Sequence, residues 1–155
     1  MLEKIKYHIM WIWGQEEGFL KRGKEGMLVI TNMRIAFVVK TRMKFRVHDE
    51  YSLRQLKRFK DGESVFMPIQ QYTEIDLEND LAENDKNIDI PFSKIINIGQ
   101  DKKRWGTVLK VKFAESEETK GYKFMVVKGW VKYPLKDPVS FQQLDWDPVI
   151  ALIQN

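Results

Sequence analysis

The sequence contains few side chains suited to catalysis or metal binding. His8 and His48 are its only histidines, and they do not stand at a metal-binding spacing. The absence of cysteine excludes a disulfide framework, a thiolate metal site and a cysteine nucleophile. No serine lies in the strand-to-helix motif of a nucleophile elbow. We therefore expect a protein with no enzymatic activity, no metal ion and no cofactor.

Two segments begin like ligand-binding loops but do not complete the motif. Residues 23 to 26 have neither the spacing of a phosphate-binding loop nor its closing Lys-Ser/Thr pair. Residues 85 to 89 begin like a calcium-binding loop, but Ile90 stands where glycine is required and Ile96 where glutamate is required. Neither segment is expected to bind its ligand.

The length and the apolar stretches indicate one globular domain. At 155 residues the chain suits a single domain, which buries roughly 70% of the surface of its unfolded chain. The longest apolar stretch, Ile9 to Trp13, is much shorter than the ~20 residues of a membrane-spanning helix, and no secretory cleavage pattern follows it. We expect a cytoplasmic protein without a transmembrane segment, either free or peripheral to a membrane.

Charge is distributed unevenly along the chain. The net charge is +4, but residues 1 to 60 hold 14 Lys/Arg against 6 Asp/Glu. Residues 61 to 100 hold only 2 Lys/Arg against 9 Asp/Glu. Such blocks indicate either an interaction surface or a solvated face.

Alternating β-branched and aromatic residues predict short strands over residues 19 to 20, 27 to 31 and 35 to 40. Asn32 and Met33 are expected to form the turn between the last two, because asparagine tolerates the left-handed backbone of a tight hairpin. We therefore expect three strands before residue 41.

Residues 41 to 87 break this strand rhythm and are expected to form a charged, helical insertion. A helix is predicted over Glu50 to Lys60, with Leu53, Leu56 and Phe59 as its buried stripe. Residues 65 to 69 have an extended pattern, which Pro68 limits to an edge. Residues 74 to 83 have the composition of a weak acidic helix.

Strand patterns resume at residue 88. Residues 90 to 98 suggest a strand with an irregularity at Pro91, and residues 108 to 113 are expected to pair with residues 122 to 128. Asp147 followed by Pro148 is a helix-start signal. The apolar side of this last helix is expected to consist of Val149, Ile150, Leu152 and Ile153.

The segment from Glu25 to Phe37 resembles the second and third strands of the GRAM and prokaryotic pleckstrin-homology-like (PH-like) families. In these families the sequence of the two strands is often glycine, two apolar residues, Thr-Asn-x-Arg, an apolar residue, any residue and phenylalanine. Residues 90 to 95 resemble the family's next strand, and residues 147 onward its closing helix. The resemblance covers residues 16 to 40 and 88 to 155.

This resemblance implies a mainly β fold, a partly open antiparallel barrel capped by a C-terminal helix. It implies one domain over residues 1 to 155, with residues 41 to 87 inserted between the third and fourth strands. PH-like proteins are mostly binding modules for lipid head groups, peptides or other domains. Phosphoinositide-binding members carry a basic-x-Arg pair on the second strand, where this chain has Met27 to Ile30. Inositol-phosphate specificity is therefore not implied.

Basic residues are expected to gather at one end of the sheet, because the first and third connections of an antiparallel meander lie at the same end. The opposing interpretation is a solvated face, or neutralisation by the acidic residues 61 to 89. The candidate ligand-binding residues are Lys21, Arg22, Lys24, Arg42, Lys44, Arg46, Arg54, Lys57 and Arg58.

Three kinds of partner suit such a module. We expect an adaptor that binds a protein partner or associates weakly with anionic membrane surfaces, and binding of nucleic acid is the alternative. Trp11 and Trp13 are expected to cover the core, with an interfacial anchor as the alternative. Trp130, Tyr133 and Pro134 are expected to plug the core, with a peptide groove as the alternative. Arg34 is expected to pair with a carboxylate or with backbone oxygens at its hairpin.

Overall fold

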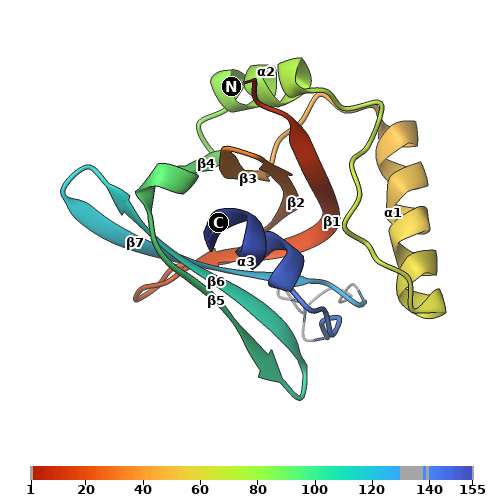
Figure 1. The fold of residues 1–155 in the computed structure, drawn as a ribbon. Coiled ribbons are helices and arrows are strands. Elements are labelled where there is room, and N and C mark those ends of the chain that lie inside the picture. Colours follow the sequence, from red (N-terminus) through yellow and green to blue (C-terminus); the bar gives the residue numbers. More distant parts are fainter. Residues whose placement is uncertain (1, 130–137, 139, 155) are drawn as a thin grey trace. The chain divides into compact units, whose positions relative to one another are not determined.

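The computed structural model of the chain describes residues 2 to 129, 138 and 140 to 154. Figure 1 follows these residues by colour along the chain. The elements in chain order are β1 (Ile5–Glu16), β2 (Lys24–Thr31), β3 (Arg34–Val38), α1 (Phe45–Asp61), α2 (Glu74–Glu83), β4 (Ile88–Pro91), the 3-10 turn η1 (Phe92–Lys94), β5 (Ile95–Lys103), β6 (Gly106–Glu115), β7 (Glu118–Val126) and α3 (Asp147–Gln154).

The seven strands form one antiparallel sheet in the order β4-β3-β2-β1-β7-β6-β5. The strands at the two ends of this order, β4 and β5, are not paired with each other, so the sheet is not closed. Helices α1 and α2 lie between β3 and β4 in the chain, and α3 is C-terminal. The predictions of a mainly β fold, a helical insertion and a C-terminal helix are confirmed at this level, whereas the PH-like barrel stays a prediction.

The chain divides into two compact units. Unit 1 consists of Met1–Trp11 and Gly26–Ile90, and unit 2 consists of Ile12–Glu25 and Pro91–Asn155. The predicted insertion, residues 41 to 87, therefore belongs entirely to unit 1.

The Thr-Asn-x-Arg turn of unit 1 closes the β2–β3 hairpin as predicted. The Oγ1 atom of Thr31 accepts hydrogen bonds from the backbone N–H groups of Met33 (2.9 Å) and Arg34 (3.0 Å). The Arg34 guanidinium donates to Glu3 from Nε and Nη2, at 2.7 Å each, and lies 3.1 Å from Asp89. Arg34 thus has the structural role expected of it, because it ties the N-terminal residues and β4 to this hairpin.

Helix α1 is longer than predicted, and its predicted apolar stripe is buried only in part. Leu53 of the predicted apolar stripe is 57% exposed, whereas Ser52 and Gln55 are buried. The Gln55 side chain accepts a hydrogen bond from the Met10 backbone N–H (2.7 Å) and donates one to the Met10 carbonyl (2.9 Å). The prediction is wrong at Leu53 alone, because Leu56 and Phe59 are half-buried. The buried face also includes Gln55 because α1 packs on a strand edge, whose free peptide groups require polar partners.

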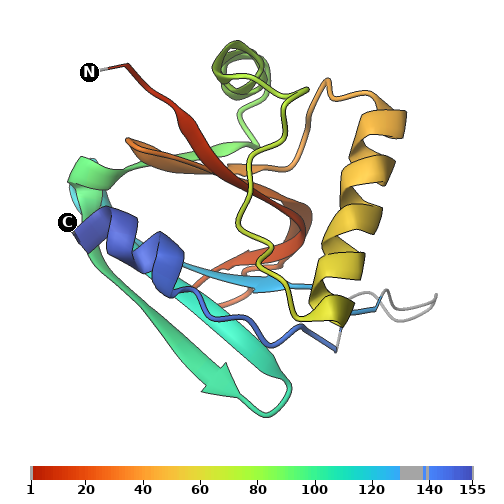
Figure 2. The ribbon, with the colours of Figure 1, turned by 45° about the vertical axis from the view of Figure 1, so that its right-hand side comes forward.

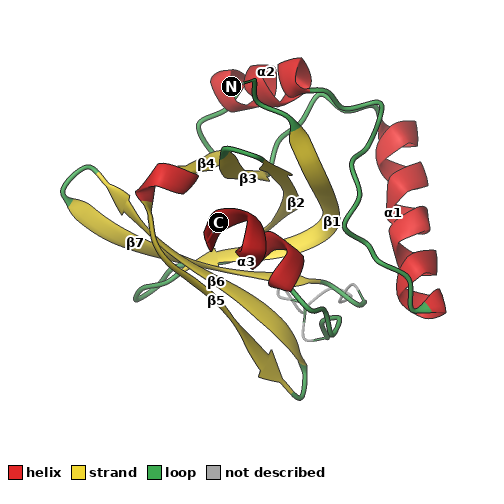
Figure 3. Cartoon of the chain, in the orientation of Figure 1, coloured by secondary structure: helices red, strands yellow, loops and turns green. Residues whose placement is uncertain are grey.

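The segment between α1 and α2 also covers this edge of β1. Figure 3 draws it as a loop, and Figure 2 shows it running beside β1. The His8 backbone N–H donates to the Met67 carbonyl (2.8 Å), and His8 Nδ1 accepts from the Ile69 N–H (2.8 Å). The extended segment predicted around Met67 is present as an isolated antiparallel bridge to His8. Residues 8 to 10 of β1 are all buried as a result.

Helix α2 has the bounds predicted for it. Thr73 and Asp76 form a capping box at its N-terminus. Near its end, the buried Asp80 carboxylate accepts hydrogen bonds from the Thr41 hydroxyl (2.6 Å), the Arg42 backbone N–H (3.0 Å) and the Tyr72 hydroxyl (2.7 Å). These bonds attach α2 to the chain that follows β3.

In unit 2, the hairpin of β6 and β7 has the predicted faces. Leu109, Val111 and Phe113 are buried, and Tyr122 stacks between Phe113 and Phe124. Figures 1 and 2 show α3 lying against these strands. Further buried residues on this side of the strands are Val126, Trp146 and Val149.

The Gln55 contact predicts an unusual order of mutational effects on α1. Gln55→Leu should lower the free energy of unfolding by about 3 kcal/mol, because it leaves a buried N–H and a buried C=O at Met10 unpaired. Leu53→Gln should change it by less than about 0.5 kcal/mol, because Leu53 is exposed. Urea unfolding monitored by circular dichroism measures both values. A larger loss for Leu53→Gln would show that the apolar stripe is the buried face after all.

The buried His8 predicts a loss of stability in acid. Burial lowers the pKa of His8 from 6.5 to about 4, so between these pH values the unfolded chain binds a proton that the folded protein excludes. Neutral His8 makes its full contribution to the free energy of unfolding above pH 6.5. This contribution is lost as the pH falls towards 4, and the loss amounts to about 3 kcal/mol. His8→Asn retains an acceptor for the Ile69 N–H but does not titrate, so its unfolding free energy should fall by about 3 kcal/mol less between pH 7 and pH 4. Parallel pH profiles for the two proteins would contradict this.

Candidate functional site

The nine predicted basic residues are divided between the two units. Lys21, Arg22 and Lys24 follow β1 in unit 2, whereas the other six lie between residues 42 and 58 in unit 1. Each set is therefore described within its own unit, and a common basic end stays a prediction.

The loop after β1 carries two exposed apolar side chains at its tip. Phe19 is 90% exposed and Leu20 is 83% exposed, the two highest values among the large apolar residues of unit 2 that the structure describes. The predicted strand at these residues is wrong, because β1 already ends at Glu16 and Leu20 has a left-handed backbone, with φ 63°. The Gly-x-x-Lys-Arg-Gly pattern of residues 18 to 23 is the loop signal that identifies them.

Contacts at the base of the loop hold this tip in place. A Cβ atom on Gly23 would lie 2.2 Å from Cε2 of Trp13, so Trp13 packs directly on the glycine backbone. Gln15 donates a hydrogen bond from its side chain to the Lys21 carbonyl (2.9 Å). These contacts attach the C-terminal side of the loop to β1.

Charges of both signs flank the loop tip, because Glu16 and Glu17 precede it whereas Lys21, Arg22 and Lys24 follow it. Lys21 lies 2.9 Å from Glu16, and Lys120 lies 3.8 Å from the same carboxylate. Arg22 and Lys24 are exposed and form no ion pair within the described part of the chain. Only these two cations of the predicted turn are available to a ligand without breaking an existing ion pair.

Half of the basic residues predicted in the insertion are neutralised locally. Arg42 lies 2.7 Å from Glu83, Arg58 lies 3.3 Å from Glu63 and Arg54 lies 3.1 Å from Glu50. The first two pairs join basic and acidic parts of the insertion, as expected if the acidic residues 61 to 89 neutralise the basic ones. The remaining three, Lys44, Arg46 and Lys57, form no ion pair among the described residues.

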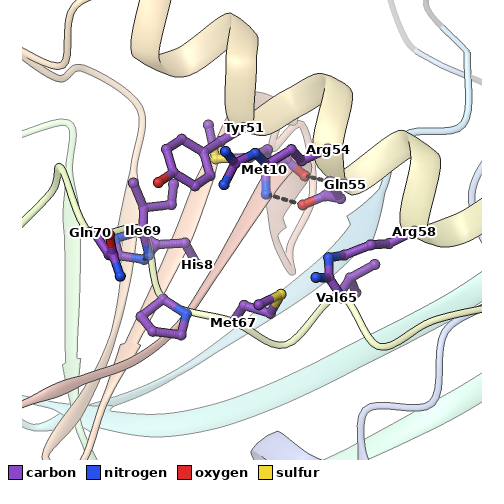
Figure 4. Close-up of a pocket in the computed structure, with 11 residues that line it drawn as sticks. His8, Met10, Tyr51, Arg54, Gln55, Arg58, Val65, Met67, Ile69 and Gln70 are labelled. Carbon is purple, nitrogen blue, oxygen red and sulfur yellow. Dashed lines mark hydrogen bonds between the residues drawn. The ribbon is translucent and has the colours of Figure 1, made fainter.

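A cavity of about 200 Å³ lies in unit 1 between α1, β1 and the segment after α1 (Figure 4). Its apolar wall includes Met10, Val65, Met67 and Ile69. In Figure 4, Gln55 bonds to Met10 between Arg54 and Arg58, which extend from the same helix. Charge, composition and periodicity do not predict this cavity, because it forms only when α1 docks against β1.

His8 lines the same cavity. Only 3% of this residue is exposed. Because Nδ1 accepts the Ile69 N–H, the proton of the neutral ring is on Nε2, which finds no hydrogen-bond partner among the described residues. The T-shaped contact with Tyr72, at 5.2 Å between ring centroids, holds the imidazole in place.

The other reactive side chains are in structural contacts. The Ser52 hydroxyl donates to the His48 carbonyl (2.8 Å) and lies 3.5 Å from His48 Nδ1, which is too far for an activated serine. The Tyr72 hydroxyl donates to Asp80, and burial raises its pKa. Within the residues that the structure describes, no cluster of three metal-ligating side chains is found.

The two tryptophans near the end of β1 have separate roles. Trp11 is partly buried against the core of unit 1, as expected, and Trp13 packs on Gly23 in unit 2. The predicted cluster of Trp130, Tyr133 and Pro134 lies outside the described residues. No helix in the described part of the chain has both the length and the apolar character needed to cross a membrane.

Comparisons with protein-family models and with curated protein sequences identified no relative of this chain. No protein-family model matches it, and no curated protein sequence matches it.

Proposed function

We propose that this protein is a non-enzymatic, PH-like binding module that associates peripherally with anionic membrane surfaces through the loop of residues 17 to 24. The observation that carries the proposal is the exposed pair at the tip, Phe19 and Leu20, beside the unpaired cations Arg22 and Lys24. Exposed apolar side chains followed by unpaired cations suit the boundary between anionic head groups and acyl chains.

The magnitudes support weak, reversible binding. Transfer of the Phe19 and Leu20 side chains into an apolar phase contributes about 4 kcal/mol together. Each of the two unpaired cations contributes about 1 kcal/mol near an anionic leaflet. The sum of about 6 kcal/mol lies between the ~4 kcal/mol of millimolar binding and the ~8 kcal/mol of micromolar binding.

The loop suits a membrane better than the other two partners. A stable protein interface buries about 800 Å² on each side, which two side chains at a loop tip do not supply. Binding of single-stranded nucleic acid uses aromatic rings on which bases stack, and Leu20 offers no such ring. An acyl-chain region accepts both apolar side chains without a complementary shape.

Co-sedimentation with vesicles tests this proposal. We expect the protein to pellet with phosphatidylcholine vesicles that contain 30% phosphatidylglycerol, and much less with phosphatidylcholine alone. Phe19→Ser with Leu20→Ser should reduce the partition coefficient at least tenfold at both low and high salt, since about 4 kcal/mol of apolar transfer is lost. Phe45→Ser is the matched control, because Phe45 is also 83% exposed but lies on α1.

Charge substitutions separate the electrostatic contribution. Arg22→Gln with Lys24→Gln should weaken binding about thirtyfold at low salt, since about 2 kcal/mol is lost, and have little effect at high salt, because screening already removes the attraction. Equal losses for the loop variants and Phe45→Ser would overturn the assignment of the loop. Pelleting abolished by competing DNA, or DNA binding without vesicle binding, would favour the nucleic-acid alternative. Binding to neither would favour a protein partner.

A further inference from the structure

We propose that the cavity beneath α1 binds a small organic carboxylate that has a compact aromatic or branched aliphatic body. This site lies entirely in unit 1 and does not depend on the membrane association proposed for the loop of unit 2.

The charged groups of the cavity favour an anion. Among the described residues, Arg54 and Arg58 are the only charged ones that line it, and each pairs with a carboxylate outside the lining, Glu50 or Glu63. The two arginines are four residues apart on α1, so their side chains share one face of the helix. Two guanidinium groups at one opening are suited to a carboxylate, which accepts parallel N–H bonds from an arginine.

Both arginines are held in position yet retain free donors. Arg58 uses Nη1 to donate to Glu63 (3.3 Å) and to the Ser64 carbonyl (3.1 Å). Arg54 donates to Glu50 from Nη2 (3.1 Å), and its guanidinium carbon lies 5.0 Å from the Tyr51 ring centroid. A guanidinium has five N–H donors, so each arginine has further donors for a ligand.

The walls and the volume select the body of the ligand. Met10, Val65, Met67 and Ile69 line the cavity with apolar side chains, of which Met67 is the exposed one. The cavity measures about 200 Å³, and an engineered apolar cavity of about 150 Å³ is known to hold benzene. One ring or a short branched chain therefore fits, with its carboxylate at the arginines. Inorganic phosphate would fill only the polar edge and gain nothing from the apolar wall.

The walls are fixed before any ligand arrives. Gln55 is bonded through both ends of its amide to Met10, and Tyr51 donates its hydroxyl to Gln71. His8 is held by its hydrogen bond from Ile69 on the opposite wall. A preformed cavity loses little free energy in ordering its side chains around a ligand.

Titration of the ¹⁵N-labelled protein, followed by ¹H–¹⁵N correlation spectra, tests the proposal with benzoate as the probe. We expect saturable shifts centred on the amides of Met10, Gln55 and Ile69, with a dissociation constant of about 1 mM or tighter. Benzamide, which has the same shape but no charge, should bind at least about tenfold more weakly. Inorganic phosphate should leave these amides unchanged at the same concentrations.

Two arginine variants and a matched control complete the test. Arg54→Gln and Arg58→Gln should each weaken benzoate binding about tenfold, whereas Lys57→Gln, on the same helix but outside the cavity, should leave it unchanged. No saturable shift with benzoate, equal affinity for benzoate and benzamide, or equal weakening by Lys57→Gln would each overturn the proposal. Vesicle binding by the same variants should be unaffected, so this site and the loop are tested separately.

Discussion

The unpaired edge of β1 at residues 8 to 10 is the constraint on which unit 1 depends. Buried peptide groups at a strand edge require hydrogen-bond partners, which a side chain can supply in place of a neighbouring strand. The Gln55 amide supplies both partners of Met10, and Met67 supplies the partner of the His8 N–H. The insertion is therefore part of the folded unit, because it completes the hydrogen bonding of an N-terminal strand.

The same contact determines what α1 presents to the solvent. When Gln55 faces β1, Leu53 is turned outward, and Arg54 and Arg58 flank the cavity. A polar residue buried against a strand edge thus leaves an apolar residue exposed and brings two cations to one opening. In unit 2, the packing of Trp13 on Gly23 has a comparable effect, because it leaves Phe19 and Leu20 at the loop tip. Each proposed site follows from a local packing constraint.

Features encoded by local sequence could be predicted. The β2–β3 turn follows from Thr31, whose side chain bonds to the backbone of Met33 and Arg34, and the start of α3 lies at the predicted Asp147. Features that depend on contacts distant in sequence could not. Gln55 and Met10 are 45 residues apart, so the helical period of α1 favoured the stripe of Leu53. The basic residues were identified, but the ion pairs that neutralise Arg42 and Arg58 depend on the fold of the insertion.

Paramagnetic relaxation is the most direct test of the central claim that the loop tip enters the membrane. The ¹⁵N-labelled protein would be mixed with anionic nanodiscs that carry a lipid spin-labelled within its acyl chain. If the loop tip enters the membrane, we expect the strongest loss of amide signal at residues 17 to 24, with little loss along α1. A loss centred on α1, or no loss at the loop while the protein remains bound, would contradict it.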